Sequence, residues 1–104
     1  MGRMLANIRI PLDPEKIADV CRRHHIRRMS LYGSVIRDDF TAMSDVDVLV
    51  ELEPDYHPGL EYFGITVELE ALFGRRVDVV RPTELSRYYK AEVLREAIPV
   101  YVAS

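Results

Sequence analysis

An apolar segment with alternating side chains limits the fold of this chain more than any other feature. The segment SDVDVLVEL, residues 44–52, is apolar at every second position: Val46, Val48, Val50 and Leu52. A period of two predicts a β-strand with one buried face. The opposite face carries Leu49 and three acids, Asp45, Asp47 and Glu51. Two carboxylates that lead a half-buried strand and point the same way require a physical explanation.

Helices and strands alternate along the rest of the chain. The first helix opens at DPEK, where Asp13 suits the N-cap, Pro14 the first helical position and Glu15 the positive end of the helix dipole. We expect helices at residues 13–24, 34–40, 60–73 and 83–97, and strands at 26–32, 45–52, 75–82 and 99–103. This αβαβαβαβ order predicts a small α/β (α+β) domain in which helices pack on a mixed sheet.

The segment 60–73 is apolar on two sides if it is helical. The two stripes are Leu60, Phe63, Val67 and Ala71, and Tyr62, Ile65, Leu69 and Leu72. A helix on the surface of a domain needs only one apolar stripe. We therefore expect one stripe against the sheet and the other against a second helix or a partner chain.

Length and charge limit the classes of protein that remain. A chain of 104 residues can bury a single modest core. We expect one domain over residues 1–104, in which residues 1–12 form an extension of unknown role. The net charge is −3, whereas general nucleic-acid binders are more often basic.

Targeting signals and disulfides are missing from the sequence. No apolar run is long enough to cross a bilayer, and the amino terminus does not resemble a signal peptide. Cys21 is the single cysteine, which excludes an internal disulfide and fits a reducing compartment. We expect a cytoplasmic protein that binds neither membranes nor nucleic acid in general, and the sequence leaves a homo-oligomer open.

The paired acids of the first segment suit a metal ion. On a strand, Asp45 and Asp47 share a face with their Cα atoms roughly 6.5 Å apart. Burying two like charges without a partner is costly, and a divalent cation removes that cost. Oxygen ligands without a Cys or His cluster favour Mg²⁺, or Mn²⁺, over Zn²⁺. Turn chemistry alone also produces D-x-D, but in haloacid-type phosphatases and D-x-D glycosyltransferases the apolar strand precedes the acids, whereas here it follows them.

Residues that could contact a phosphate stand just before this strand. Gly33-Ser34 lies at a strand-to-helix junction, where glycine lets a phosphate approach and a helix N-terminus offers N–H groups. Ser34 suits a plain N-cap equally well. Arg37 lies three residues after Ser34, on nearly the same face of a helix. There it could reach a phosphate or pair with a surface acid such as Asp38 or Asp39.

Asp78 is a further acid that an apolar strand does not explain. It stands alone in VDVV, between Val77 and Val79. If this strand lies next to the strand at 45–52, Asp78 falls beside Asp45 and Asp47. The chain would then hold three carboxylates at one place in the sheet.

Together these segments resemble a known family. GSVIRDDFTAMSDVDVLV is similar to the G-S-x-A-R-G…S-D-x-D-x-x-V signature of the polymerase-beta-type nucleotidyltransferases, and LFGRRVDVV resembles the segment with their third acid. The resemblance to the minimal nucleotidyltransferase (MNT) subfamily spans residues 13–102, including the closing PTELSRYYKAEVLREAIPVYV. It implies the nucleotidyltransferase fold.

The resemblance also implies roles for individual residues. Asp45 and Asp47 would bind two Mg²⁺ ions, and Asp78 would complete the site of the ion that activates the attacking hydroxyl. The implied catalytic and metal-binding residues are Asp45, Asp47 and Asp78. Gly33 and Ser34 would hold the β- and γ-phosphates of ATP. With Arg37, which we add from its spacing, the predicted nucleotide-binding residues are Gly33, Ser34 and Arg37. The implied reaction moves a nucleotidyl group in line onto a hydroxyl while pyrophosphate leaves.

A partner follows from the same resemblance. MNT proteins look like antitoxin halves of two-component modules with HEPN-domain ribonuclease toxins, in which AMP from ATP is transferred to a tyrosine of the toxin. We see no acceptor-binding domain in this chain, so we expect the acceptor on a separate molecule. The second apolar stripe of the 60–73 segment is a place for that molecule to dock.

The sequence departs from the family pattern near the arginine. The family commonly has small Ala and Gly there, whereas this chain has Ile36 and Asp38, followed by Asp39. If these acids point outward, solvent and salt screen their charge within about 10 Å. If they point inward, the affinity for a triphosphate falls.

Two other functions stay open at this level. The chain could neutralise its partner by contact alone, although none of the three acids is replaced. It could also act on a small molecule such as an aminoglycoside, or on an RNA end, although no acceptor-binding domain for either is visible.

The remaining polar and aromatic residues carry weaker signals. His24 and His25 do not suit a metal pair, because adjacent helical side chains diverge by about 100°. His24 more simply packs at the helix end, and His57 is a loop histidine expected in solvent. Tyr88 and Tyr89 could pack the last helix or touch a nucleobase, and the sequence does not decide between these roles.

Overall fold

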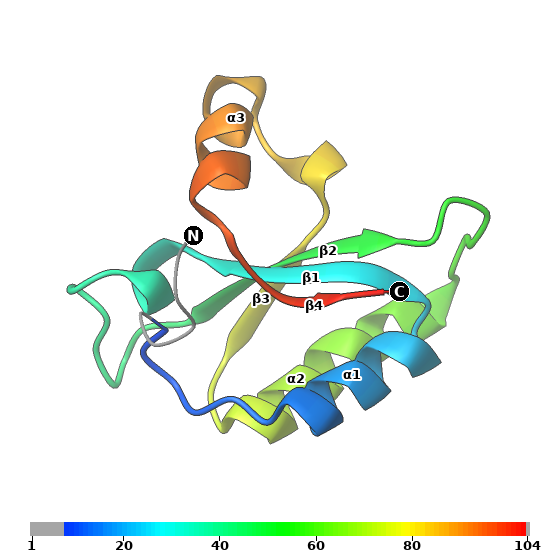
Figure 1. The fold of residues 1–104 in the computed structure, drawn as a ribbon, viewed down its shortest axis with the longest axis horizontal. Helices are drawn as coiled ribbons and strands as arrows, with labels where there is room; N and C mark the ends of the chain where they lie inside the picture. The colour runs from blue at the N-terminus through cyan, green and yellow to red at the C-terminus, as the bar shows by residue number, and fades with distance from the viewer. Residues whose placement is uncertain (1–7, 104) are drawn as a thin grey trace.

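The computed structural model describes residues 8–103 and confirms a small mixed α/β domain (Figure 1). Helices α1, α2 and α3 span Pro14–Arg23, Phe63–Phe73 and Arg87–Glu96. Strands β1, β2, β3 and β4 span Ile26–Tyr32, Val46–Leu52, Val77–Val80 and Ile98–Val102. Short 3-10 helices η2, η3 and η4 span Gly33–Ile36, Leu60–Tyr62 and Pro82–Glu84.

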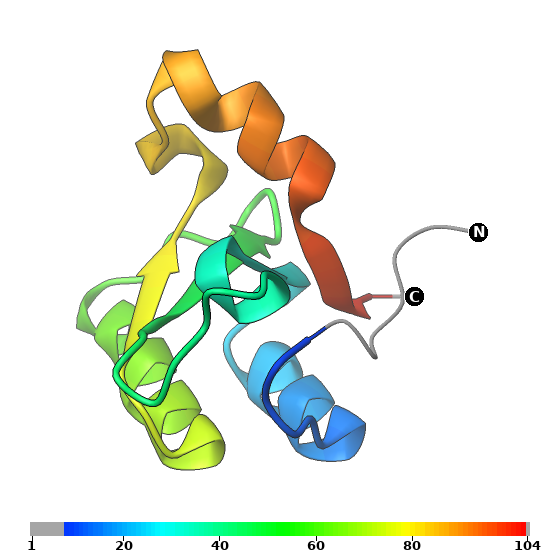
Figure 2. The same cartoon turned by 90° about the vertical axis from the view of Figure 1, so that its left-hand side faces the viewer.

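The four strands form one sheet in the order β3-β2-β1-β4. β2 runs parallel to β3 and antiparallel to β1, which is also antiparallel to β4. Helices α1 and α2 cover one face of the sheet, and α3 stands over the opposite face (Figures 1 and 2). The sheet is therefore the middle layer of the domain, and its two faces serve different purposes.

The face covered by α1 and α2 holds the hydrophobic core. Val46, Val48 and Val50 of β2 are fully buried and belong to one cluster with Ile17 of α1 and Leu69 of α2. The predicted alternation of β2 is therefore confirmed. On the opposite face, Leu49 is also buried, in a small cavity lined partly by Leu94 and Ala97 at the end of α3.

The prediction of a helix at residues 34–40 is wrong. Only the single 3-10 turn η2 forms there. The backbone at Arg37 is extended, with φ −126° and ψ 170°. An α-helix would use the carbonyl of Val35 within the helix, but here it accepts a hydrogen bond of 2.9 Å from the N–H of Arg9. Nε of Arg9 also donates to the carbonyl of Arg37 at 3.1 Å. The segment before α1 thus competes for the groups that would propagate the helix.

The residues before α1 contribute to the core as well. Ile8 and Ile10 are buried and belong to the main cluster, which Leu12 also contacts. The described part of the segment that we treated as an extension thus packs on the domain. Residues 1–7, which make up the rest of it, lie outside the residues that the structure describes.

The last predicted helix is interrupted near its start. We expected one helix at 83–97, but η4 ends at Glu84 and α3 begins at Arg87. Between them, the side chain of Ser86 accepts a hydrogen bond from the N–H of Tyr88 at 3.2 Å and forms the N-cap of α3. A serine cap inside the segment therefore starts a new helix.

The two apolar stripes of α2 and η3 have different surroundings, as we expected. Ile65 and Leu69 are buried against the sheet. Leu60, Phe63 and Val67 are exposed by 83%, 66% and 66% within the single chain. This second stripe is free to contact another molecule.

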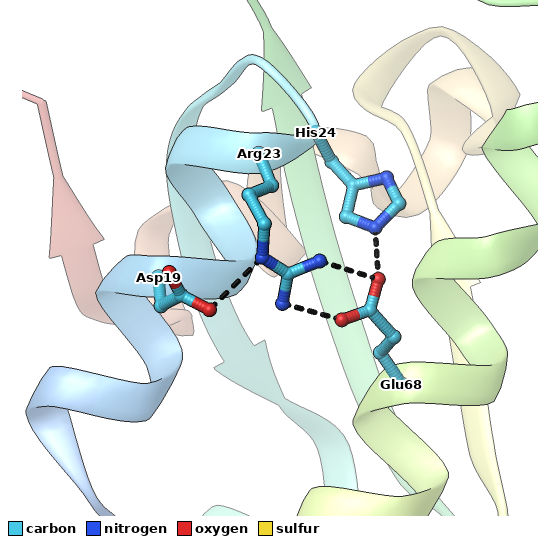
Figure 3. A network of polar contacts seen from close by, with 4 residues as sticks. All are labelled: Asp19, Arg23, His24 and Glu68. Carbon is cyan, nitrogen blue, oxygen red and sulfur yellow. Dashed lines mark hydrogen bonds and ion pairs between the residues drawn. The ribbon is translucent and has the colours of Figure 1, made fainter.

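A polar network joins α1 to α2 (Figure 3). The guanidinium of Arg23 donates two hydrogen bonds to the carboxylate of Glu68, at 2.5 and 3.0 Å, and a third to Asp19 at 2.9 Å. The imidazole Nε2 of His24, at the end of α1, also contacts Glu68. The hydrogen bonds from Arg23 and then from His24 lower the pKa of Glu68 to about 2. His24 thus lies at the helix end, as we expected, and its ring contacts Glu68 there.

Replacing Glu68 tests how much this network stabilises the domain. We expect Glu68→Gln to lower the free energy of unfolding at pH 7 by roughly 1–2 kcal/mol, because the ion pair with Arg23 is lost and one amide oxygen replaces two carboxylate acceptors. The folded pKa is depressed, so the contribution of Glu68 is present above about pH 4.5 and disappears as the pH falls toward 2. Urea unfolding at pH 7, 4.5 and 3 measures this. Glu15→Gln, at an exposed acid of α1, is the control; equal effects of the two variants would contradict a special role for Glu68.

Candidate functional site

Three side chains form a row across the sheet on the face below α3. In the strand register, Asp47 of β2 lies opposite Tyr32 of β1 on one side and Asp78 of β3 on the other. Burial, followed by the charges of Asp47 and Asp78, raises the pKa of the Tyr32 phenol. The phenol therefore stays neutral and forms one wall of the site. Asp78 stands beside Asp47, as expected for adjacent strands.

Asp47 occupies the most unfavourable electrostatic position in this row. Burial raises its pKa first, and the carboxylates of Asp78 and Asp45 raise it further, whereas Arg37 lowers it. Asp45 lies just before β2 and is half exposed, with the Nε of Arg76 3.8 Å from its Oδ1. Asp78 and Asp45 thus both lie close enough for their charges to act on Asp47.

Gly33 lies directly against Asp47. Its φ is +76°, in the left-handed region that other residues rarely adopt. A methyl group at this position would overlap Oδ2 of Asp47 and lie 3.3 Å from its Cγ. The backbone angle therefore favours glycine, and a larger residue would also have to displace the Asp47 carboxylate. The fold brings the predicted phosphate-contacting turn, with the partly exposed Ser34, next to the predicted acids.

An arginine that sequence reasoning did not single out positions the loop before β2. The NH1 group of Arg75 donates to the carbonyls of Thr41 and Ser44 at 3.2 and 3.3 Å. Its guanidinium also lies 4.5 Å from the ring centre of Phe40. Arg75 therefore holds the loop that delivers Asp45. In the sequence, its position next to Arg76 and Val77 was the only signal. The contacts of Arg75 with the loop depend on the tertiary fold, so the sequence pattern could not show them.

Arg37 does not lie where we expected. Because η2 ends at Ile36, Arg37 does not share a helical face with Ser34, and its NH2 group donates to Glu96 of α3 at 2.9 Å. Its partner is thus a surface acid, as in the alternative that we considered, but from another element. Asp38 points into solvent and pairs with Arg9, so its charge is directed away from the row of acids.

The acids fit a hard divalent cation in donor chemistry and in charge. Carboxylate oxygens on one face are the ligands that Mg²⁺ and Mn²⁺ prefer. Burial and then the charges of Asp78 and Asp45 raise the pKa of Asp47, and a bound cation would offset both effects. Over residues 8–103, however, no three Asp, Glu, His or Cys side chains are already arranged to hold a metal ion. The carboxylates are neighbours that have to rotate to share an ion.

The single cysteine takes no part in the site. The thiol of Cys21 is buried, which raises its pKa to about 12 and keeps it unreactive. Among the described helices, none has the length and apolar character needed to span a membrane.

A small mixed sheet that carries acids beside a glycine turn is the arrangement that the resemblance in the sequence implies. Residues 15–104 match the family described as polymerase beta, nucleotidyltransferase. The chain therefore belongs to the polymerase-beta-type nucleotidyltransferase family. The resemblance inferred from the sequence motifs is confirmed.

Several named proteins are similar over most of their length. The chain is 36% identical over 78 residues to the protein adenylyltransferase MntA of Thermococcus cleftensis, covering 75% of this chain and 78% of MntA. It is 32% identical over 85 residues to a candidate protein adenylyltransferase of Methanocaldococcus jannaschii, covering 82% and 90%. A solved structure described as a candidate minimal nucleotidyltransferase superposes with a TM-score of 0.70 at 37% identity, covering 83% and 87%.

More distant solved structures share the fold. A toxin–antitoxin structure with AMP-PNP superposes with a TM-score of 0.69 at 20% identity, covering 89% of this chain and 76% of that chain. A complex of tri-AMPylated HEPN toxin from Shewanella oneidensis with MNT antitoxin superposes with a TM-score of 0.60, also at 20% identity, covering 86% and 70%. At this identity the likeness establishes the architecture of this chain.

The contact between Gly33 and Asp47 predicts an effect of Gly33→Ala beyond backbone strain. Gly33→Ala and Gly74→Ala each place alanine at a positive φ, and each should cost about 1–2 kcal/mol of stability. A methyl group at Gly74 meets nothing within 4 Å, so Gly74→Ala is a matched control. We expect only Gly33→Ala to weaken binding of a nucleoside triphosphate as well, by at least about tenfold, in calorimetric titrations. Equal affinities in the two variants would show that the turn does not contact the ligand.

The crowding of carboxylates predicts that Asp47→Asn stabilises the protein without ligand. The folded pKa of Asp47 is raised, so its charge opposes folding above that pKa and ceases to do so as the pH falls and the carboxylate protonates. We expect a gain of roughly 0.5–1 kcal/mol at pH 7 that vanishes near pH 3. Thermal unfolding at both pH values measures it. Asp39→Asn, at an exposed acid, should change stability by less than about 0.5 kcal/mol, and a loss of stability in Asp47→Asn would contradict the proposed repulsion.

Proposed function

We propose that this protein is a Mg²⁺-dependent protein adenylyltransferase that moves AMP from ATP to a tyrosine hydroxyl of a HEPN-domain toxin and so acts as its antitoxin. The observation that carries the proposal is the pair of neighbouring acids, Asp47 and Asp78, with the glycine turn at Gly33 directly against Asp47. The names of the similar proteins support protein adenylylation, and those of the structural neighbours support a toxin partner.

The chain's own residues would divide the work as follows. Asp45, Asp47 and Asp78 would hold Mg²⁺, which when bound lowers the pKa of the attacking hydroxyl and neutralises the leaving charge. Gly33 and Ser34 would place the β- and γ-phosphates against the turn η2. Arg37 would stay on Glu96 of α3 and contribute by joining the turn η2 to that helix. Most of the rate would come from position and electrostatics.

The reaction is a balanced exchange of one bond to phosphorus for another. The phenolic oxygen of the acceptor attacks the α-phosphorus of ATP, and the bond from that phosphorus to the bridging oxygen of the β-phosphate breaks. Pyrophosphate leaves, and AMP remains on the tyrosine. Asp78, an exposed carboxylate beside Asp47, would take the phenolic proton.

The exposed apolar stripe of α2 would provide a docking surface for the toxin. Leu60 belongs to η3, and Phe63 and Val67 belong to α2, which covers the face of the sheet opposite the acids. A partner that docks on α2 would therefore have to reach around the domain to present its tyrosine. We place the reaction in the cytoplasm, where ATP is available and a lone cysteine stays reduced.

Binding and transfer test the proposal in two stages. We expect the non-hydrolysable analogue AMP-PNP to bind the wild type in a calorimeter only with Mg²⁺, and the double variant Asp45→Asn/Asp47→Asn to lose that binding. With ATP and the purified toxin, mass spectrometry should find AMP on a toxin tyrosine. Asp78→Asn should slow the transfer at least about a hundredfold.

Two results would overturn parts of the proposal. If the folded wild type does not bind AMP-PNP, either alone or with the toxin present, the proposed adenylyltransferase activity is contradicted. Neutralisation of the toxin by Asp45→Asn/Asp47→Asn as effectively as by the wild type would leave an antitoxin that acts by contact alone.

A further inference from the structure

A cavity separates the glycine turn from α3. It has a volume of about 220 Å³. Its lining residues are Tyr32, Gly33, Arg37, Tyr89, Glu92, Val93 and Glu96. In Figure 2, α3 lies above η2, so the cavity lies on the same face of the sheet as Asp47. Sites that enclose a small ligand usually measure about 300–1,000 Å³, so this cavity can enclose only part of a nucleoside triphosphate.

The charges around the cavity exclude the phosphates from it. Arg37 is the one cation of the lining, and its guanidinium is bound to Glu96 at 2.9 Å. Glu92 adds a second carboxylate, whose charge also acts on Arg37. One positive charge against two negative charges repels a triphosphate. The phosphates would therefore lie outside this cavity, beside Asp47 and the metal ions that the acids would hold.

The walls of the cavity suit a flat and largely apolar group instead. Tyr32 and Tyr89 supply two aromatic rings, and Val93 supplies an aliphatic surface. Tyr32 is half buried, while Tyr89 is 47% exposed and so presents ring surface that the chain itself does not cover. Aromatic side chains of this kind stack on nucleobases.

We propose that this cavity holds the nucleobase of the substrate, with Tyr89 as its stacking wall and Glu92 as the acceptor that reads an exocyclic amino group. The inference rests on the proposed function, since it assigns a subsite to the same nucleotide. Glu92 rather than Glu96 is available because Arg37 occupies Glu96. A carboxylate only accepts hydrogen bonds, so it favours adenine, which carries an amino group, over hypoxanthine, which carries a carbonyl oxygen there.

The neighbouring tyrosines of α3 offer a matched test. Tyr88 is 93% exposed and does not line the cavity, whereas Tyr89 lines it. We expect Tyr89→Ala to weaken AMP-PNP binding with Mg²⁺ by roughly 5- to 100-fold, the loss typical of base stacking, and Tyr89→Phe to restore most of it. Binding of inorganic tripolyphosphate, which has no base, should not change in Tyr89→Ala, and Tyr88→Ala should match the wild type with both probes.

Base selection gives a second measurement on the same site. We expect the wild type to bind AMP-PNP about tenfold more tightly than the hypoxanthine counterpart. We expect Glu92→Gln to remove most of that preference, because a glutamine side chain can donate to a carbonyl oxygen as well as accept from an amino group. Circular dichroism confirms that each variant is folded.

Each outcome decides between the subsite and the proposed function. If Tyr89→Ala weakens only AMP-PNP, the cavity is the base subsite. If Tyr89→Ala leaves AMP-PNP unchanged, or weakens tripolyphosphate equally, the inference is overturned while the nucleotidyltransferase site stands. An unchanged affinity would leave the cavity for another occupant, such as the acceptor tyrosine. If the wild type binds neither probe, alone or with the toxin present, both the inference and the proposed function fail.

Discussion

The contact between the Asp47 carboxylate and Gly33 is the constraint on which the site depends. The strand register places this partly buried carboxylate on the central strand β2, between Tyr32 and Asp78. Burial and the neighbouring like charges raise its pKa there. Such a position opposes folding. The remainder of the domain supplies the stability that tolerates it, and a bound cation would turn the same repulsion into affinity.

The two faces of the sheet separate stability from chemistry. The face toward α1 and α2 carries the buried valines of β2 and the core cluster, and the network around Glu68 fixes these two helices to each other. The face toward α3 carries the acids, the glycine turn and a partly open cavity. Because neighbouring residues of a strand point to opposite faces, β2 serves both purposes with alternate side chains.

Membership in the polymerase-beta-type family would explain the acids, while the contacts around Arg37 follow from the tertiary structure of this chain. Arg37 reaches across to Glu96 and links η2 to α3. Asp38, where the family commonly has glycine, faces solvent and pairs with Arg9. The departure from the family pattern therefore places its charge outside the site, and the segment before α1 becomes part of what holds the turn.

The sequence alone determined those features that follow from local pattern. Alternating apolar residues specified β2, the Asp13-Pro14 start specified α1, and the lone acid in VDVV identified Asp78 as a residue without a packing role. Helix caps and the alternation of side chains along a strand depend on residues close together in the sequence, so a single segment is enough to predict them. The roles of the acids came from the family motifs, and the experiments above test them.

Only the tertiary structure decided what depends on contacts between distant segments. Arg9 uses the carbonyl of Val35 and stops the expected helix after one turn, so Arg37 meets Glu96 rather than the face of Ser34. Arg75 holds the loop before β2 by donating to the carbonyl of Ser44, from which it is 31 residues away in the sequence. The cavity beside Gly33 exists because α3 crosses over the sheet. Hydrogen bonds and charges select partners by distance in space, and a sequence pattern holds no record of those distances.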